Sequence, residues 1–163
     1  MTATLHTPPT ATHFVDPNGP VDPTHFKTIT AALLAAGNRA LVAIAAGTYV
    51  ESLQPTRSVT LIGRCARDVV LQSPGSNTSG VRIKGVVATV EGVTVRGMYT
   101  GVAINVGGTL TLRRVVLEAN RELGATVSDA GSTLTIEDSV IPRARRWGSS
   151  STAPAPPCRS RTA

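Results

Sequence analysis

The chain has 163 residues, of which 41% are hydrophobic but only 3% are aromatic, and its net charge is +6. This length fits a single domain, and the apolar content excludes a chain that is disordered throughout. No apolar run approaches the roughly 20 residues that a membrane-spanning helix needs, and the N-terminus lacks the basic and apolar regions of a signal peptide.

The positive charge is concentrated after residue 141. Residues 142–163 hold five of the 16 Lys and Arg residues and no acid, whereas the preceding residues hold the other eleven and all 10 Asp and Glu residues. A surface that binds nucleic acid needs a basic stripe together with aromatic side chains for base stacking. The nearly neutral body of the chain lacks such a stripe, so we expect no nucleic-acid partner.

Two elements are predicted before the main repeat. Residues 1–23 form a polar segment, rich in Thr and Pro, which contains the turn signal Asp16-Pro17-Asn18-Gly19. Residues 24–37 are predicted to form a helix, with Thr24 as its N-cap and Gly37 at its end. The apolar face of this helix recurs every three to four residues and consists of Phe26, Ile29, Leu33 and Ala36.

Residues 41–141 carry a repeat of 22–24 residues, and each period holds three short segments with apolar residues at alternate positions. The first series is Val59-Thr60-Leu61, Ala88-Thr89-Val90, Leu110-Thr111-Leu112 and Leu134-Thr135-Ile136. The second series is Val69-Val70-Leu71, Val93-Thr94-Val95, Val115-Val116-Leu117 and Ser139-Val140-Ile141. The third series is Val81-Arg82-Ile83, Val102-Ala103-Ile104 and Ala125-Thr126-Val127. Because the same segments recur in the same order, and not as mirror-image hairpins, the pattern predicts an all-β, right-handed parallel β-helix.

The predicted β-helix occupies residues 24–141 and has about four coils of three short strands, capped at its N-terminal end by the helix over 24–37. Inward positions of successive coils stack, as in the expected buried column of Val90, Leu112 and Ile136. Outward positions stack as well: one column contains Glu91, Arg113 and Glu137, and another contains Arg96 and Glu118. These columns place opposite charges on neighbouring strands, which stabilises the pairing weakly.

The β pattern stops in mid-coil at Pro142. Residues 142–163 are rich in Arg, Ser, Pro and Ala, and we expect them to be a disordered basic tail. A solenoid must cover the apolar stack at each end, and the residues after Ile141 lack the pattern to do so. The chain is therefore either a truncated or frame-shifted β-helix, or it self-associates through an uncapped C-terminal coil.

One segment resembles a known family. Residues 41–52, which contain Gly47-Thr48-Tyr49-Val50-Glu51, are followed by Val59-Thr60-Leu61-Ile62-Gly63. These residues resemble the first coils of the pectin-lyase-like superfamily of right-handed parallel β-helix proteins. Pectin methylesterases carry a similar Gly-x-Tyr-x-Glu motif, preceded by a helix that resembles Ile29-Thr30-Ala31-Ala32. The resemblance covers about residues 14–72, and it implies a polysaccharide partner and an extracellular or cell-surface location.

The resemblance does not extend to catalysis. The pectin methylesterase strings Gln-Asp-Thr-Leu, Asp-Phe-Ile-Phe-Gly and Gly-Arg-Pro-Trp do not occur, and the chain lacks the clustered acids of polysaccharide lyases. Tyr49 and Glu51 are therefore expected to be structural, and no catalytic residue is predicted. The main hypothesis is a non-catalytic β-helix module with a carbohydrate-associated recognition or surface-structural role. The alternative is a truncated fragment of an enzyme similar to pectin esterases or polysaccharide lyases.

A second alternative is that the protein binds a crystalline lattice through threonines. Thr60, Thr89, Thr111 and Thr135 fall on one outward column, and Thr109 and Thr133 lie beside it. Exposed strand positions favour Thr in any protein, but a flat array of hydroxyl and methyl groups also suits a repetitive ligand such as ice or crystalline polysaccharide. These six threonines are the predicted ligand-binding residues.

No cofactor and no metal site is predicted. Asp16, Asn18 and Asp22 resemble a fragment of a calcium loop, but the Pro- and Gly-containing turn explains them. Cys65 and Cys158 lie far apart in the sequence and are expected to be free thiols.

Overall fold

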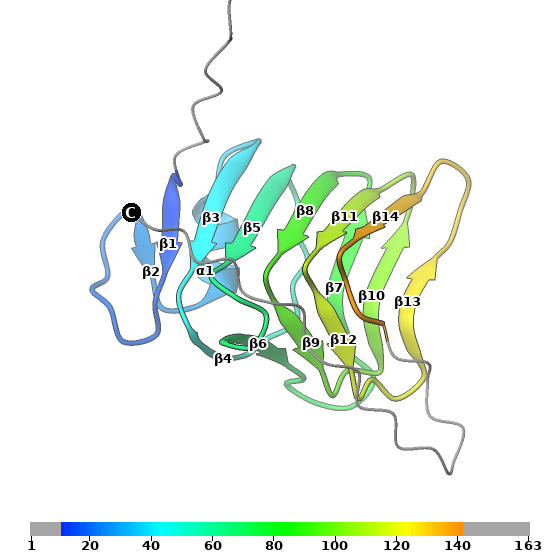
Figure 1. Cartoon of the computed structure of the whole chain (residues 1–163). Coiled ribbons are helices and arrows are strands. Elements are labelled where there is room, and N and C mark those ends of the chain that lie inside the picture. The colour runs from blue at the N-terminus through cyan, green and yellow to red at the C-terminus, as the bar shows by residue number, and fades with distance from the viewer. Residues whose placement is uncertain (1–10, 142–163) are drawn as a thin grey trace, which may run out of the picture.

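The computed structural model describes residues 11–141. In this part of the chain the fold is a parallel β-solenoid of about 4 turns, with a short helix near the N-terminal end (Figure 1). All strand pairings among these residues are parallel. The predicted parallel β-helix is therefore confirmed.

Three sheets form the walls of the solenoid. Sheet 1 has the order β14-β11-β8-β5-β3-β1-β2 and is built from β1 (His13–Val15), β2 (His25–Phe26), β3 (Ala40–Ile44), β5 (Val59–Gly63), β8 (Val87–Glu91), β11 (Thr109–Arg113) and β14 (Thr133–Glu137). Sheet 2 has the order β13-β10-β7 and consists of β7 (Ser79–Lys84), β10 (Thr100–Asn105) and β13 (Leu123–Val127). Sheet 3 has the order β12-β9-β6-β4 and consists of β4 (Gly47–Val50), β6 (Val69–Gln72), β9 (Thr94–Arg96) and β12 (Val116–Glu118).

The register of the strands follows the three predicted series. On sheet 1, Thr111 pairs with Thr89 of β8 and with Thr135 of β14. The second series pairs in the same way on sheet 3, where Val95 lies between Leu71 and Leu117. The third series does so on sheet 2. Each coil thus lies directly over the previous one, with its inward and outward positions aligned.

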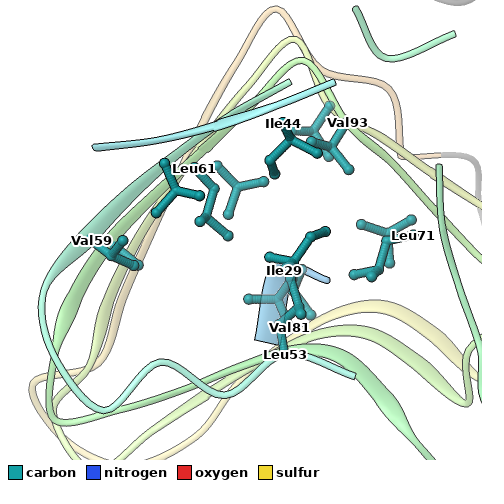
Figure 2. Packing of buried hydrophobic residues seen from close by; sticks show 14 of the residues in the cluster. Ile29, Ile44, Leu53, Val59, Leu61, Leu71, Val81 and Val93 are labelled. Carbon is teal, nitrogen blue, oxygen red and sulfur yellow. The ribbon is translucent and has the colours of Figure 1, made fainter. Parts of the chain in front are cut away.

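Aliphatic side chains from all three sheets fill the interior. Figure 2 shows eight of them pointing into the coil: Ile29, Ile44, Leu53, Val59, Leu61, Leu71, Val81 and Val93. In the predicted column of Val90, Leu112 and Ile136, the first two are buried, but Ile136 is 46% exposed. Ile136 was expected to be buried, and this expectation is wrong because β14 is the last strand of sheet 1 and has a neighbour on one side only.

The helix α1 (Ile29–Ala35) is shorter than the predicted helix over 24–37, and its N-cap is Thr28 and not Thr24. The start is displaced because Asp22 Oδ1 accepts hydrogen bonds from the backbone N–H groups of Thr24 and His25, at 2.7 and 2.8 Å. This turn directs the chain into β2, so helical geometry begins only after Phe26. A seven-residue helix is not stable alone, and Ile29 anchors α1 in the core of the solenoid.

Sheet 1 continues beyond β3 into residues 1–23, which the sequence predicted to be a polar segment. β1 lies between β3 and β2, and its Val15 is buried in the core. The sequence of this segment showed only a short apolar step at Phe14 and Val15 before the turn at residues 16–19. Together, β1, β2 and α1 lie at the N-terminal end of the solenoid (Figure 1).

From β7 onward, the chain turns between sheets at residues with left-handed backbone geometry, and these residues also stack from coil to coil. From sheet 2 to sheet 1 the turning residues are Gly85, Val106 and Asp129; from sheet 1 to sheet 3 they are Gly92, Arg114 and Asp138; from sheet 3 to sheet 2 they are Gly97 and Ala119. Their φ angles lie between 48 and 73°. We call these three sets the corner columns. They bend the chain sharply in the coils from β8 onward, whereas the β3–β4 and β5–β6 connections contain no residue with a positive φ.

Two further expectations concern the cysteines and the tail. The expectation that Cys65 is a free thiol is wrong, because its sulfur is disulfide-bonded. Cys158 and the predicted disordered tail over 142–163 lie outside the described residues.

The first testable prediction concerns the register. Leu112 is fully buried, whereas the adjacent Thr111 faces outward. Leu112→Asp buries an unpaired charge and should lower the free energy of unfolding by roughly 4 kcal/mol or more. Thr111→Asp should lower it by about 1 kcal/mol at most, because its carboxylate stays in water. Thermal melting checks both variants, and equal melting temperatures would contradict the register.

The second prediction concerns the corner columns. Val106 is an exposed, β-branched residue at φ 57°, a conformation that costs an L-residue roughly 1–2 kcal/mol. Val106→Gly should therefore raise the free energy of unfolding by about 1 kcal/mol, after the entropic cost of glycine is subtracted. Gly92→Ala is the opposite control, because at φ 65° its new Cβ would lie 2.4 Å from the carbonyl oxygen of Gly63. Urea denaturation should show stabilisation for the first variant and strong destabilisation for the second.

Candidate functional site

The structure brings the six predicted threonines together on the outer face of sheet 1. Thr60, Thr89, Thr111 and Thr135 lie on successive strands β5, β8, β11 and β14 and pair in register. Thr109 and Thr133 pair in the adjacent outward column, next to Val87. We call this surface the threonine face. Its placement was predicted correctly from the repeat, whereas its role in ligand binding stays a prediction.

The hydroxyl groups of the threonine face are not used by the fold. Among residues 11–141, no hydroxyl of the six takes part in a hydrogen bond within the protein, although their backbones pair in the sheet. Other threonines of the solenoid are engaged: Thr94 Oγ1 donates to the carbonyl of Ala66 at 2.6 Å, and Thr126 Oγ1 donates to that of Val102 at 3.4 Å. The threonine face therefore presents hydroxyl groups whose donor and acceptor capacity is left for water or a ligand.

The geometry of this face is regular because the strands are parallel. Neighbouring strands of a sheet lie about 4.8 Å apart, and outward residues of one strand lie about 6.6 Å apart. The six threonines thus form a grid of hydroxyl and methyl groups with two fixed repeats. Thr133 and Thr135 are exposed, and the other four are partly exposed.

A row of charged residues borders the threonine face. Arg113 lies between Glu91 and Glu137 in the register, as predicted. Its Nε contacts Glu137 Oε2 at 2.9 Å, but Glu91 forms its ion pair with Arg114, the next residue along the chain. Arg114 reaches Glu91 because it is a corner residue with φ 50° and departs from the strand alternation there. The border is therefore made of paired charges and adds little net charge to the face.

The second charge column differs from its expected pairing. Arg96 and Glu118 are partners in the register of sheet 3. The guanidinium group of Arg96 instead donates a hydrogen bond to Gln72 Oε1 at 3.2 Å, on the strand at its other side. The register was thus predicted correctly, whereas the hydrogen-bond partner of Arg96 was predicted as Glu118 and is Gln72.

A polar pocket that the sequence did not indicate lies at the corner between sheets 3 and 2. It has a volume of about 340 Å³ and is lined by the loop over residues 72–77 and by Gly97, Tyr99 and Arg121. The phenol of Tyr99 is hydrogen-bonded to Glu122, and this bond raises the pKa of Tyr99. The signal in the sequence was the length of the loop: six residues separate β6 from β7, whereas three separate β9 from β10.

Tyr49 and Glu51, the residues of the Gly-x-Tyr-x-Glu motif, have structural contacts. Glu51 accepts hydrogen bonds from the backbone N–H groups of Ile29 at 2.9 Å and Thr30 at 2.8 Å, which are unpaired donors at the start of α1. Tyr49 is buried, and its hydroxyl donates to the carbonyl of Ala45 at 2.9 Å. The motif thus joins α1 to the first coil.

A local cluster of His25, Asp22 and Thr24 also escaped sequence analysis. His25 Nδ1 lies 2.8 Å from Asp22 Oδ2, and Thr24 Oγ1 donates to Asp22 Oδ1 at 2.8 Å. These hydrogen bonds, led by that from His25, hold the pKa of Asp22 well below its usual range. Because the hydroxyl donates to the carboxylate, it is not arranged as a nucleophile activated by the imidazole. The cluster is a turn that directs the chain into β2.

Comparison with known proteins adds no function. No family model, no curated protein and no solved structure matches the chain. In residues 11–141, no group of three or more His, Cys, Asp or Glu side chains is placed to hold a metal ion. Over the same residues, no helix has the length and apolar character needed to cross a membrane.

The third prediction concerns Tyr49. Burial, with smaller contributions from Asp16 and Glu51, raises the pKa of Tyr49 from 10.0 to about 12. The unfolded chain therefore releases this proton at lower pH than the folded protein, so stability is lost as pH rises from about 10 to about 12. Tyr49→Phe should be less stable near neutral pH, because the bond to Ala45 is lost, but its stability should fall less over that window. Urea denaturation across the window tests this, and an identical pH dependence in the two proteins would contradict it.

Proposed function

We propose that the protein is a non-catalytic β-solenoid module that binds polysaccharide, with the threonine face as its contact surface. The observation that carries this proposal is the combination of regular spacing and unused hydroxyl groups on that face. Six threonines lie in register there, and within the described chain none of their hydroxyls is satisfied by the protein. A fold needs outward residues on these strands, but it does not need unsatisfied hydroxyls stacked in two columns.

The chemistry of the face matches that of a saccharide surface. Polysaccharides present alternating C–H and O–H groups at fixed repeats, and the threonines offer methyl and hydroxyl groups at repeats fixed by the sheet. Each neutral hydrogen bond contributes only about 0.5–1.5 kcal/mol, so useful affinity requires many contacts made together. A flat face over four strands provides such contacts to an extended or crystalline chain, but few to a single sugar.

The resemblance of residues 14–72 to the pectin-lyase-like superfamily supports the same ligand class. This support is an analogy at the level of fold, because the same fold carries different functions in different proteins. An extracellular or cell-surface location follows from the same analogy. The catalytic strings of the pectin methylesterases are absent from the chain, so we assign this chain a role in binding and not in catalysis.

The fourth prediction tests this binding. The purified protein should bind insoluble polysaccharides such as microcrystalline cellulose, chitin or pectate gel in a pull-down assay. Thr111→Lys places a long charged side chain at the centre of the face and should weaken binding by about tenfold or more, which corresponds to about 1.4 kcal/mol. The matched control is Thr48→Lys, the same change at an exposed position on β4 of sheet 3, which should bind like the parent.

Three results would contradict the proposal. The first is no binding of the parent to any of the polysaccharides, and the second is equal binding of the parent and Thr111→Lys. The third is turnover of pectin by the purified chain, which would favour the enzyme alternative. The parent protein could instead bind no polysaccharide but slow ice recrystallisation, and Thr111→Lys could lose this effect. That result would identify ice, and not polysaccharide, as the ligand of the threonine face.

A further inference from the structure

The C-terminal end of the solenoid exposes an apolar face. Leu123, Val127 and Ile136 occupy inward positions in the last coil and are 46, 47 and 46% exposed. In the same inward columns one coil earlier, Ile104 and Leu112 are 1 and 0% exposed. These side chains point into the interior of the last coil. They are exposed because no further coil covers them among the described residues.

The same end presents unpaired strand edges. Among residues 11–141, β13 pairs with β10 alone and β14 pairs with β11 alone. Each therefore has a free edge of backbone N–H and C=O groups, and such an edge is a template for pairing with another chain. Figure 1 shows β13 and β14 at the opposite end of the solenoid from β1 and β2.

The N-terminal end lacks these properties. Its edge strand β2 has only two residues and is preceded by Pro20 and Pro23. Proline, short edge strands and charged residues are the features by which proteins prevent pairing at a sheet edge. α1 also packs against β1, β2 and β3 at this end. Stacking of one solenoid's C-terminal end on the N-terminal end of the next is therefore disfavoured.

The residues after 141 do not have the sequence of a further coil. Residues 142–163 contain no Val, Leu, Ile, Phe or Met, and they include Pro142, Pro154, Pro156 and Pro157. This composition lacks the aliphatic residues that fill the three inward stacks of residues 41–141, and each proline lacks a backbone N–H donor. A second copy of this chain has both the apolar face and the free strand edges that the C-terminal end requires.

We propose that the C-terminal end is covered by the C-terminal end of a second copy, with the two β14 strands paired antiparallel about a two-fold axis at Thr135. This register places Leu134 opposite the partner's Ile136, so inward residues meet inward residues. It places Thr133 opposite the partner's Glu137, which keeps the two Glu137 carboxylates apart. A two-fold pairing closes after two copies and does not lead to fibres. The threonine columns of the two copies then form one continuous face.

The fifth prediction tests the dimer by light scattering during gel filtration of the full chain. The parent should have twice the molar mass of the chain. Ile136→Lys places charges where the two cores meet and should give a molar mass of one chain. Leu34→Lys is the matched control, because Leu34 is 73% exposed on α1 at the other end, and it should stay dimeric. A monomeric parent, a dimeric Ile136→Lys, or a monomeric Leu34→Lys would overturn the proposal.

If Ile136→Lys loses its strand signal in circular dichroism, the variant is unfolded and its molar mass is not informative. Disulfide cross-linking then tests the dimer. Directly paired antiparallel residues have Cα atoms about 4.5–5.5 Å apart, which lies within the range that a disulfide spans. Under mild oxidation, Thr135→Cys should form a covalent dimer that a reducing agent separates. Thr111→Cys, in the same column but one strand away from the edge, should form none. No cross-linking of Thr135→Cys, or equal cross-linking of both variants, would overturn the proposal.

Discussion

The corner columns are the constraint on which the rest of the structure depends. From β7 onward, left-handed backbone geometry at the corners bends the chain sharply enough for each coil to return above its own start. Because these corner residues stack, every strand between them starts at the same level of the next coil, and all pairings become parallel and in register. Glycine adopts this geometry without strain, whereas Val106 and Ala119 do so at a cost that the packed core must offset.

Register links the core to the candidate binding surface. The alternation that buries Leu110 and Leu112 must point Thr109 and Thr111 outward, and stacking repeats this arrangement on β14. A regular aliphatic core therefore produces a regular outer face without further cost. What the core does not dictate is the residue type on that face. Threonine suits exposed strand positions in any sheet, and the alignment of its unused hydroxyls in two columns is the feature on which our proposal of binding rests.

Patterns that recur along the chain predicted the structure well, and features set by single contacts did not. Three repeated series with alternate apolar residues were enough to predict the coils, their register and the threonine face. The start of α1 was misplaced because Thr24 is a good N-cap by type, yet Asp22 already binds its N–H. The expected burial of Ile136 was wrong because a repeat does not show where the last layer lies. The pocket beside Tyr99 depends on one longer loop and was missed for that reason.

The most direct test of this account is measurement of backbone nuclear Overhauser effects by solution NMR. Stacked parallel coils predict contacts between the backbones of Thr89, Thr111 and Thr135, which are 22 and 24 residues apart in the sequence. The contacts should have the parallel pattern, with close approach of Hα to amide protons but not of Hα to Hα across strands. Strong Hα–Hα contacts between strands adjacent in sequence would indicate antiparallel hairpins and would contradict the account.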